Sequence, residues 1–394
     1  MSYFERAAKC SSLLFLFLLG CFAAAQGRQI QNRADRPRVV AAKWERVYWE
    51  TGGAGFKSVF SGPVLPKKTY SPRWLWVGDD KGFLRLIAFG PDSQSPLGPP
   101  PSPIPALQYF GMSKLEVTSP NVADVRTSGA SVNAIYFDES GDGYLLKGNK
   151  LYFTDNAGFN WRQLFEVQNL PDGTPATLFS IAVTGRGACV VGMFSRPDEV
   201  RESLVYCTDR PPTNKDVRWE RVIVKPQTQL FHVFFRDDKR GWIVGTQGTI
   251  LRTTNGGKDW DPVEFEGESL LQSYFVSEND GWIVGRYGTV LRTSDGGEHW
   301  APVQFTFDSQ LSNISLRSVR FSGDGRLGWI VGDQGTILHS DDGGETWRML
   351  LPPPPRDIKL ETPAKDIRLE ALFVDDDFCW AVGSGGNIWR QRLK

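Results

Sequence analysis

The chain has 394 residues, of which 40% are hydrophobic and 23% are charged, which is ample apolar material for a large core. Its 45 basic and 45 acidic residues give a formal net charge of zero. No global charge therefore attracts the chain to nucleic acid or to an anionic membrane surface, and nucleic acid is not expected as a partner.

Residues 1–25 have the pattern of a signal peptide, with a short basic segment followed by an apolar run at residues 13–19. The run is too short for a membrane-spanning helix, which needs about 20 residues. Two cleavage sites compete. The small residues 23–25 would release a soluble protein, whereas Cys21 follows a sequence that resembles a bacterial lipoprotein signal and would be lipidated. Residues 26–42 form a polar linker before the folded part, which is expected over residues 43–394.

The folded part is built of repeats. The sequence Gly-Trp-Ile-Val-Gly occurs at residues 241–245, 281–285 and 328–332, and the period of roughly 40–50 residues is typical of β-propellers. Each repeat contains four short runs rich in β-branched and aromatic residues, separated by polar or glycine-containing turns. Four antiparallel strands of this kind make one propeller blade.

Weaker copies precede the clear repeats, beginning at residues 56–87, and a last copy at residues 369–390 lacks its outermost strand. Residues 44–49 resemble an outermost strand and are unassigned near the start. We therefore predict an all-β fold, a seven-bladed β-propeller closed by this N-terminal strand, which completes the last blade and covers its exposed edge. The proline-rich insertion at residues 91–105 is expected to be an extended surface loop.

Four turns share an Asp-box pattern, with Ser or Thr first, Asn or Asp third, Gly fifth and Trp eighth. Asn or Asp can accept backbone N–H bonds within its turn, Gly permits a positive φ, and Trp can pack against the sheet. We interpret these residues as structural, and as neither catalytic nor calcium-binding. They are Asn156, Gly158 and Trp161; Asn255, Gly257 and Trp260; Asp295, Gly297 and Trp300; and Asp342, Gly344 and Trp347.

Two cysteines, Cys189 and Cys207, lie on strands expected to be neighbours. They can form a disulfide in an oxidising compartment or serve as small buried apolar residues, and the sequence alone favours the second reading. No cysteine pair has zinc-site spacing and the three histidines are scattered, so neither a metal site nor a cofactor is expected.

The repeated Gly-Trp-Ile-Val-Gly run followed by the Asp box resembles the photosystem II assembly and stability factors and related bacterial propellers. The likeness is good over residues 229–350 and loose elsewhere. It implies a non-enzymatic, monomeric propeller, exported to the periplasm or thylakoid lumen, often as a lipoprotein, which binds protein clients such as unassembled membrane-protein subunits.

The resemblance also implies an arginine-rich binding surface. The candidates for a carboxylate-binding patch are Arg252, Arg286, Arg292, Arg317 and Arg320. Because Asp boxes also occur in sialidases, the alternative function is a secreted glycosidase. The sequence lacks the aromatic-Arg-Ile-Pro motif that introduces the arginine triad of sialidases.

Overall fold

The structure is a computed structural model whose chain divides into two units, Met1–Ala42 and Lys43–Lys394. The described residues all belong to the second unit: 44–48, 55–61, 73–81, 84–89, 109–110, 114–115, 130–138, 141–156, 158, 160–196, 199–350 and 367–393. The predicted signal peptide with Cys21, the linker and the insertion at residues 91–105 lie outside this part of the chain. Within it, no helix is long and apolar enough to cross a membrane.

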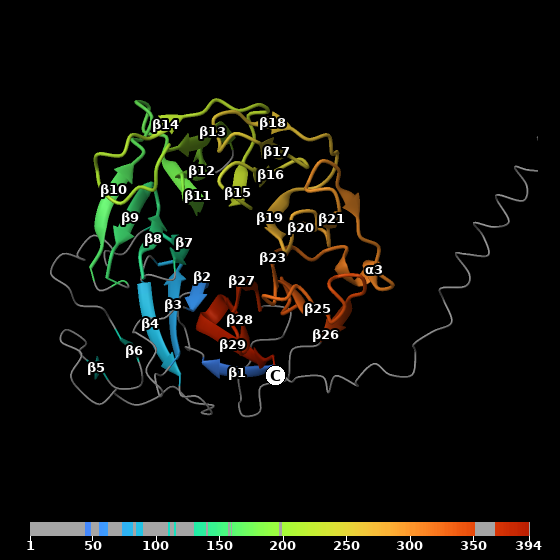
Figure 1. Cartoon of the computed structure of the whole chain (residues 1–394). Coiled ribbons are helices and arrows are strands. Elements are labelled where there is room, and N and C mark those ends of the chain that lie inside the picture. The colour runs from blue at the N-terminus through green and yellow to red at the C-terminus, as the bar shows by residue number, and fades with distance from the viewer. Residues whose placement is uncertain are drawn as a thin grey trace, which may run out of the picture. The chain divides into compact units, whose positions relative to one another are not determined.

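Six antiparallel sheets have four strands each, and they form the regular blades of a propeller (Figure 1). Three of them contain β7 (Val132–Phe137), β8 (Gly143–Lys147), β9 (Lys150–Thr154) and β10 (Arg162–Glu166); β11 (Ala176–Thr184), β12 (Gly187–Arg196), β13 (Glu199–Cys207) and β14 (Glu220–Arg221); β15 (Leu230–Phe235), β16 (Gly241–Gly245), β17 (Ile250–Thr253) and β18 (Asp261–Pro262).

The other three contain β19 (Leu270–Phe275), β20 (Gly281–Gly285), β21 (Val290–Thr293) and β22 (Ala301–Pro302); β23 (Leu316–Phe321), β24 (Gly328–Gly332), β25 (Ile337–Ser340) and β26 (Arg348–Leu350); β27 (Leu369–Val374), β28 (Phe378–Gly383), β29 (Asn387–Arg392) and β1 (Glu45–Tyr48). Two short helices, α3 (Asp308–Leu311) and η3 (Ser384–Gly386), lie in the connections.

The remaining sheet does not follow the blade pattern. It has five strands, in the order β2 (Phe56–Ser61), β3 (Arg73–Asp79), β4 (Leu84–Phe89), β6 (Lys114–Leu115) and β5 (Tyr109–Phe110). The prediction of seven four-stranded blades is therefore wrong, because the structure has six. A proline-rich sequence follows β4, and proline cannot donate to a strand ladder, so the outer positions are taken by two-residue strands much later in the chain.

The predicted closure is confirmed. Strand β1 pairs antiparallel with β29, the last strand of the chain, with Glu45 opposite Arg390. Trp44 is buried in the same cluster as Trp329 and Trp389. The N-terminal strand therefore completes the last blade and covers an edge that would otherwise be unpaired.

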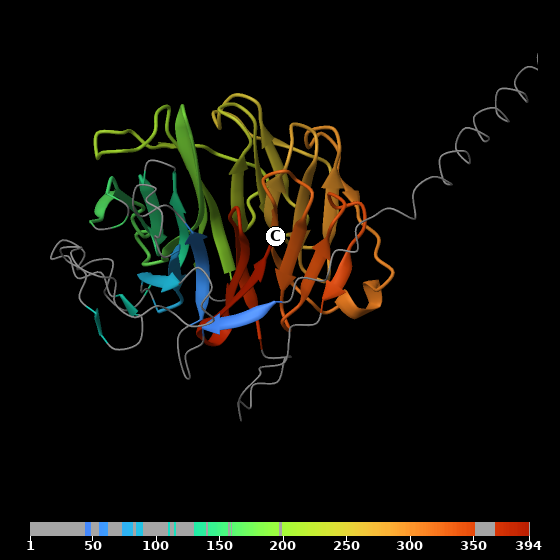
Figure 2. The same ribbon diagram turned by 60° about the horizontal axis from the view of Figure 1, so that its bottom comes forward.

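The sheets form a ring because their innermost strands touch in succession, from β2 through β7, β11, β15, β19, β23 and β27 and back to β2 (Figures 1 and 2). Since neighbouring strands are antiparallel, two ends of the ring can be distinguished. We call the end where the innermost strands begin the start face, and the end where they finish, which carries the Asp boxes, the box face.

Every residue of the three Gly-Trp-Ile-Val-Gly strands is buried, because each is the second strand of its blade and is covered on both faces by neighbouring blades. Trp242, Trp282 and Trp329 are at most 1% exposed. These strands hold the blades together and position the turns at the two ends of the ring.

Candidate functional site

The four Asp boxes have one hydrogen-bond pattern. In the box at Thr253, the hydroxyl donates to Asn255 Oδ1 over 3.0 Å and accepts from the Gly257 N–H over 3.0 Å. Asn255 Oδ1 also accepts from the Asp259 N–H over 3.1 Å, and Gly257 has a φ of 87°. The carbonyl oxygen of the Asn side chain is thus occupied inside its own turn.

The box tryptophans pack edge-on against the last aromatic residue of their own innermost strand. Trp300, for example, is 9% exposed, and its ring centroid lies 5.7 Å from that of Phe275. The same T-shaped contact recurs between Trp161 and Phe137, Trp260 and Phe235, and Trp347 and Phe321. The contact ties the fourth strand of a blade to its first.

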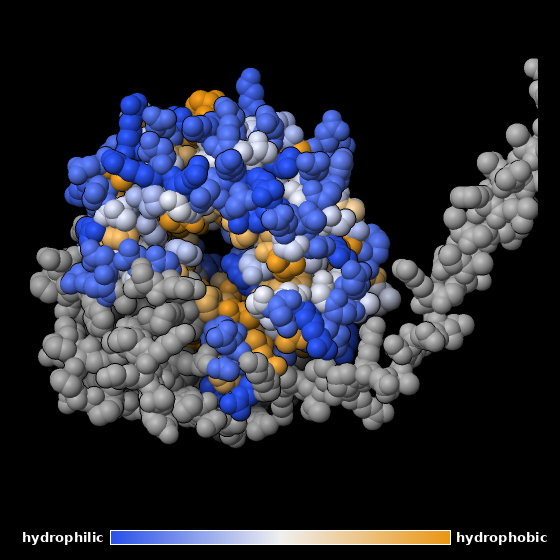
Figure 3. All heavy atoms as spheres, viewed as in Figure 1, coloured by the Kyte–Doolittle hydropathy of each residue, from blue (hydrophilic) through white to orange (hydrophobic). Residues whose placement is uncertain are grey.

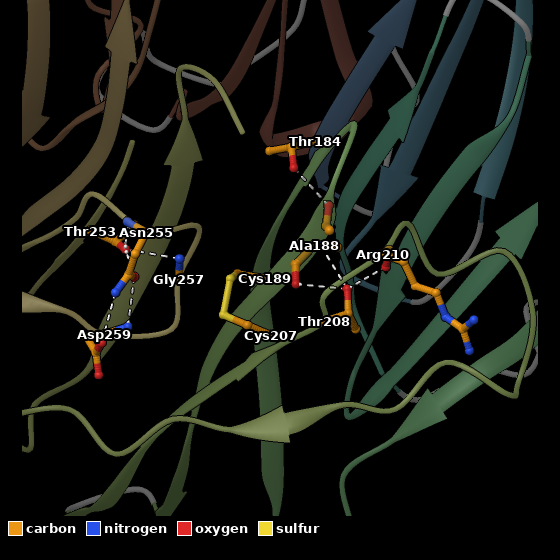
Figure 4. The surroundings of a disulfide bond; sticks show 11 residues. Thr184, Ala188, Cys189, Cys207, Thr208, Arg210, Thr253, Asn255, Gly257 and Asp259 are labelled. Atoms are coloured by element: carbon orange, nitrogen blue, oxygen red, sulfur yellow. Dashed lines mark hydrogen bonds between the residues drawn. A yellow bond between two sulfur atoms is a disulfide. The ribbon is translucent and has the colours of Figure 1, made fainter. Parts of the chain in front are cut away.

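Cys189 and Cys207 form a disulfide, so the reading as separate small apolar residues is wrong (Figure 4). They are directly opposite each other on β12 and β13, which leaves their Cα atoms 4.2 Å apart. The symmetric placement of the two residues about the intervening loop was the signal in the sequence.

The disulfide takes the place of a Trp-Arg pair. In the next blade the corresponding opposed residues are Trp242 and Arg252. The sulfurs contact the box of that next blade, because a Cβ on Gly257 would lie 2.5 Å from Cys189 Sγ. Trp242 approaches the following box in the same way, where a Cβ on Gly297 would lie 2.3 Å from its Nε1. A small glycine is therefore required in both of these boxes to admit the preceding blade.

Arg252 and Arg292 make ion pairs between blades. Arg252 Nη2 lies 3.2 Å from Glu298 Oε1, and Arg292 Nη2 lies 2.8 Å from Glu345 Oε1, with each glutamate in the box of the following blade. The hydrogen bond from Arg292 to Glu345 raises the pKa of this guanidinium against the opposing effect of burial. Both glutamates are largely exposed, so each pair is expected to add less than about 1 kcal/mol to stability.

The five candidate arginines do not form one patch. Arg252 and Arg292 are the penultimate residues of their third strands and Arg320 is the fifth residue of β23, which places these three toward the box face. Arg286, in the turn after β20, and Arg317, the second residue of β23, lie toward the start face. Their proximity in the sequence does not predict a common surface, because Arg317 and Arg320 are three positions apart but lie toward opposite ends of one strand.

A charged cluster on the start face was missed in the sequence. Glu370 of β27 has a side chain only 9% exposed, and it lies 2.8 Å from Lys57 Nζ and 3.2 Å from Arg317 Nη1. Arg317 Nε also contacts Asp333 Oδ1 over 2.7 Å. These carboxylates, with their hydrogen bonds, raise the pKa of Arg317, although burial opposes the effect. The cluster connects three successive innermost strands.

The residues that form this cluster occupy a repeated position. The pairing register of every innermost strand shifts at one residue, a β-bulge, which is the fourth residue of β11 and the second residue of the other six strands. On one side of the ring the bulged residues are polar or charged, namely Lys57, Asn133, Arg317 and Glu370. On the other side they are apolar, namely Phe179, Phe231 and Leu271. Figure 3 shows the ring hollowed at its centre, with hydrophobic residues beside the opening.

Known proteins resemble part of this ring in sequence. A model of the family described as "Photosynthesis system II assembly factor YCF48" matches residues 211–277 and 266–367. Residues 211–367 of the chain are therefore similar to the photosystem II assembly-factor family of Asp-box propellers. As the sequence indicated, the family's motifs are clearest in the three blades that follow the disulfide.

Curated relatives of this assembly-factor family match over short segments. The photosystem II stability/assembly factor HCF136 of the Cyanidioschyzon merolae chloroplast is 32% identical over 68 residues, which is 17% of this chain and 16% of the relative. The photosystem II assembly lipoprotein Ycf48 of a Picosynechococcus strain is 35% identical over 60 residues, or 14% of this chain and 18% of the relative. The matched segments thus span less than a fifth of each relative.

Solved structures share the fold over most of the chain. A structure described as YCF48 bound to D1 peptide has a TM-score of 0.57 and 15% identity, and the match covers 91% of this chain and 99% of that one. A xyloglucanase from Xanthomonas campestris has a TM-score of 0.58 and 13% identity, covering 90% of this chain and 54% of the enzyme. The fold by itself therefore does not separate binding proteins from enzymes.

Among the described residues of this propeller, no group of three or more His, Cys, Asp or Glu side chains is arranged to hold a metal ion. The chemistry that the described groups offer consists of arginine and lysine donors, aromatic surfaces at the centre of the ring and carboxylates already engaged in turns and ion pairs.

Proposed function

We propose that this protein is a non-enzymatic propeller that holds a protein or peptide client, as an assembly or stability factor for membrane protein complexes. The client is a newly made membrane-protein subunit, and an unassembled photosystem II subunit is its specific form. The observation that carries the proposal is the match of residues 211–277 and 266–367 to the assembly-factor family. The structural relative that was solved with a peptide supports the same role.

The protein is proposed to be exported to the periplasm or a thylakoid lumen. The Cys189–Cys207 disulfide supports this location, because disulfides persist in oxidising compartments and are rare in the cytosol. The signal-peptide pattern of residues 1–25 supports it independently, and Cys21 is a proposed site of lipidation.

The electrostatics of one described carboxylate bear on the glycosidase alternative. A glycosidase acid needs a raised pKa beside a second carboxylate. Burial, and then the charges of Asp138 and Asp155, raise the pKa of Asp142. The Asp142 backbone N–H donates to Asp138 Oδ1, which indicates that Asp138 orders its own loop.

Arg286 is the candidate arginine best placed to contact a client. It is exposed on the start face, and no ion pair of its side chain occurs among the described residues, whereas Arg252, Arg292 and Arg317 are paired with carboxylates. Its neighbour Tyr287 is 56% exposed, so a cation and an aromatic ring are presented together.

The test is capture of clients by the immobilised protein from detergent-solubilised thylakoids of cells arrested in photosystem II assembly. We expect enrichment of unassembled over assembled subunits, and a several-fold loss with Arg286→Ala. Arg218→Ala is the matched control, because Arg218 is also exposed but lies on an outer loop. Equal capture of assembled and unassembled subunits would contradict an assembly role.

A parallel screen on sialosides and β-glycans tests the enzyme alternative. We expect no turnover. Turnover by the native protein that is abolished by Asp142→Asn would replace the binding role with a glycosidase.

A further inference from the structure

Arg320 is a cation in a place where the other blades have none. It is the fifth residue of the innermost strand β23, counted from Leu316. The corresponding side chains of the other described innermost strands are uncharged. They are Tyr136, Ala182, Phe234, Tyr274 and Phe373.

The direct contacts of Arg320 are all with neutral groups. Its Nη1 donates to Gln272 Oε1 over 3.0 Å and to the Val319 carbonyl over 2.8 Å. Its guanidinium carbon lies 5.1 Å from the ring centroid of Tyr274. No carboxylate forms an ion pair with it in the described part of the chain. Arg317, on the same strand, has two acidic partners.

The absence of a counter-charge has an electrostatic consequence. Burial lowers the pKa of Arg320, whereas carboxylates raise the pKa of Arg292 and Arg317. A guanidinium stays protonated under all ordinary conditions, so Arg320 is a half-buried positive charge without a carboxylate partner among the described residues. Such a charge is costly to fold, and an anion that enters the site offsets the cost.

A second donor faces the same interior. The pKa of His232 on β15 is lowered to about 3, first by burial and then by the charge of Arg320, so its imidazole is neutral. His232 Nδ1 accepts the Ser273 backbone N–H over 3.3 Å, which leaves the hydrogen on Nε2. Within the described residues no hydrogen bond uses that N–H. Both side chains are only partly buried and remain accessible.

We propose that the interior bounded by the innermost strands β15, β19 and β23 binds one carboxylate, with Arg320 as the cationic anchor and His232 Nε2–H as a second donor. A guanidinium suits a carboxylate because its planar donors match two oxygens, and the aromatic ring of Tyr274 keeps water away from the pair. The carboxylate is carried by a client peptide, in which case the site rests on the proposed function, or by a free organic acid.

The experiment uses the full-length protein and isothermal titration calorimetry. The probes are benzoate, and a capped hexapeptide of glycine and alanine with a single glutamate, compared with its glutamine twin. We expect benzoate, the glutamate peptide or both to bind to the native protein. If the glutamate peptide binds, its glutamine twin should bind at least tenfold more weakly. The variant Arg320→Met should bind the carboxylate at least tenfold more weakly than the native protein. Arg218→Met is the control, because it removes an exposed arginine from an outer loop, away from the innermost strands.

Thermal unfolding separates a lost site from a lost fold. Arg320→Met is expected to unfold at the same temperature as the native protein or higher, and Arg320→Lys, which keeps the charge, is expected to retain part of the binding. Binding of benzoate alone assigns the site to a free acid, and binding of the peptide assigns it to a client. The proposal is overturned if the native protein binds neither carboxylate, or if Arg320→Met binds them as the native protein does. Client capture that persists while no carboxylate binds would refute the interior site and leave the client-binding role intact.

Discussion

The change Trp300→Ala removes the side chain that ties the fourth strand of a blade to its first. Trp300 is 9% exposed, and its ring meets Phe275 edge-on with centroids 5.7 Å apart. Removing on the order of 200 Å² of buried surface at about 25 cal/mol per Å² gives roughly 5 kcal/mol as an upper estimate. Partial collapse of the site reduces the cost, so we expect a loss of about 3–5 kcal/mol in the free energy of unfolding.

Urea denaturation monitored by circular dichroism measures this loss as a lower midpoint at an unchanged slope. Trp300→Phe is the matched control, because it keeps an aromatic edge and removes an indole N–H that has no partner, so about 1 kcal/mol or less should be lost. Tyr287→Ala controls for an exposed aromatic residue and should leave the midpoint unchanged. An unchanged midpoint for Trp300→Ala would show that the box does not stabilise the blade.

Four further predictions follow from individual contacts. Gly257→Ala should cost about 2–4 kcal/mol of unfolding free energy, because Gly257 has a φ of 87° and a Cβ would collide with the disulfide, whereas Gly173→Ala, at φ 81° with open space around it, should cost only about 1 kcal/mol. Glu370→Gln should lower the melting temperature at neutral pH, because its basic partners lose their buried carboxylate, and the difference should shrink in high salt if the reasoning holds. His232→Gln should reduce the loss of unfolding free energy at acidic pH. The imidazole binds a proton below about pH 6.5 in the unfolded protein but only near pH 3 in the folded protein. The native protein therefore loses up to about 1.4 kcal/mol of unfolding free energy per pH unit between these values. Cell fractionation of Cys21→Ser decides the processing route, since release from the membrane indicates lipidation and an unchanged soluble pool indicates cleavage without it.

Two results would contradict the reasoning behind the glycine and histidine predictions. Equal losses for the two glycine variants would show that the disulfide does not press on the box. Identical acid profiles for His232→Gln and the native protein would show that the imidazole does not stay neutral in the fold.

Much of the fold could be predicted from the sequence because the repeats are strict where strands are buried on both faces. Residues 44–49 were assigned to the last blade because they resemble an outermost strand, and the pairing of Glu45 with Arg390 confirms that reasoning. The irregular sheet could not be anticipated, because β5 and β6 have two residues each and carry no periodic pattern.

The side-chain chemistry was less predictable for a physical reason. Whether an arginine is free depends on carboxylates contributed by other blades, such as Glu298 for Arg252, and these partners are 46 positions apart in the chain. The disulfide posed the same problem, because Cys189 aligns with Trp242 only once the register of the blades is known.

The pairing of β1 with β29 also determines when the last blade can form during synthesis and folding. The partner of β1 is β29, which follows all the other strands of the ring in the sequence, so the last blade is complete only when residues 387–392 have become available. Until then both β1 and the edge of the unfinished blade have unpaired backbone groups, and a second chain in the same state could supply the missing strand. If the full-length chain is present before folding begins, β29 can pair with β1 of the same chain. The effective concentration of β1 is then high, so intramolecular closure outcompetes strand exchange between chains.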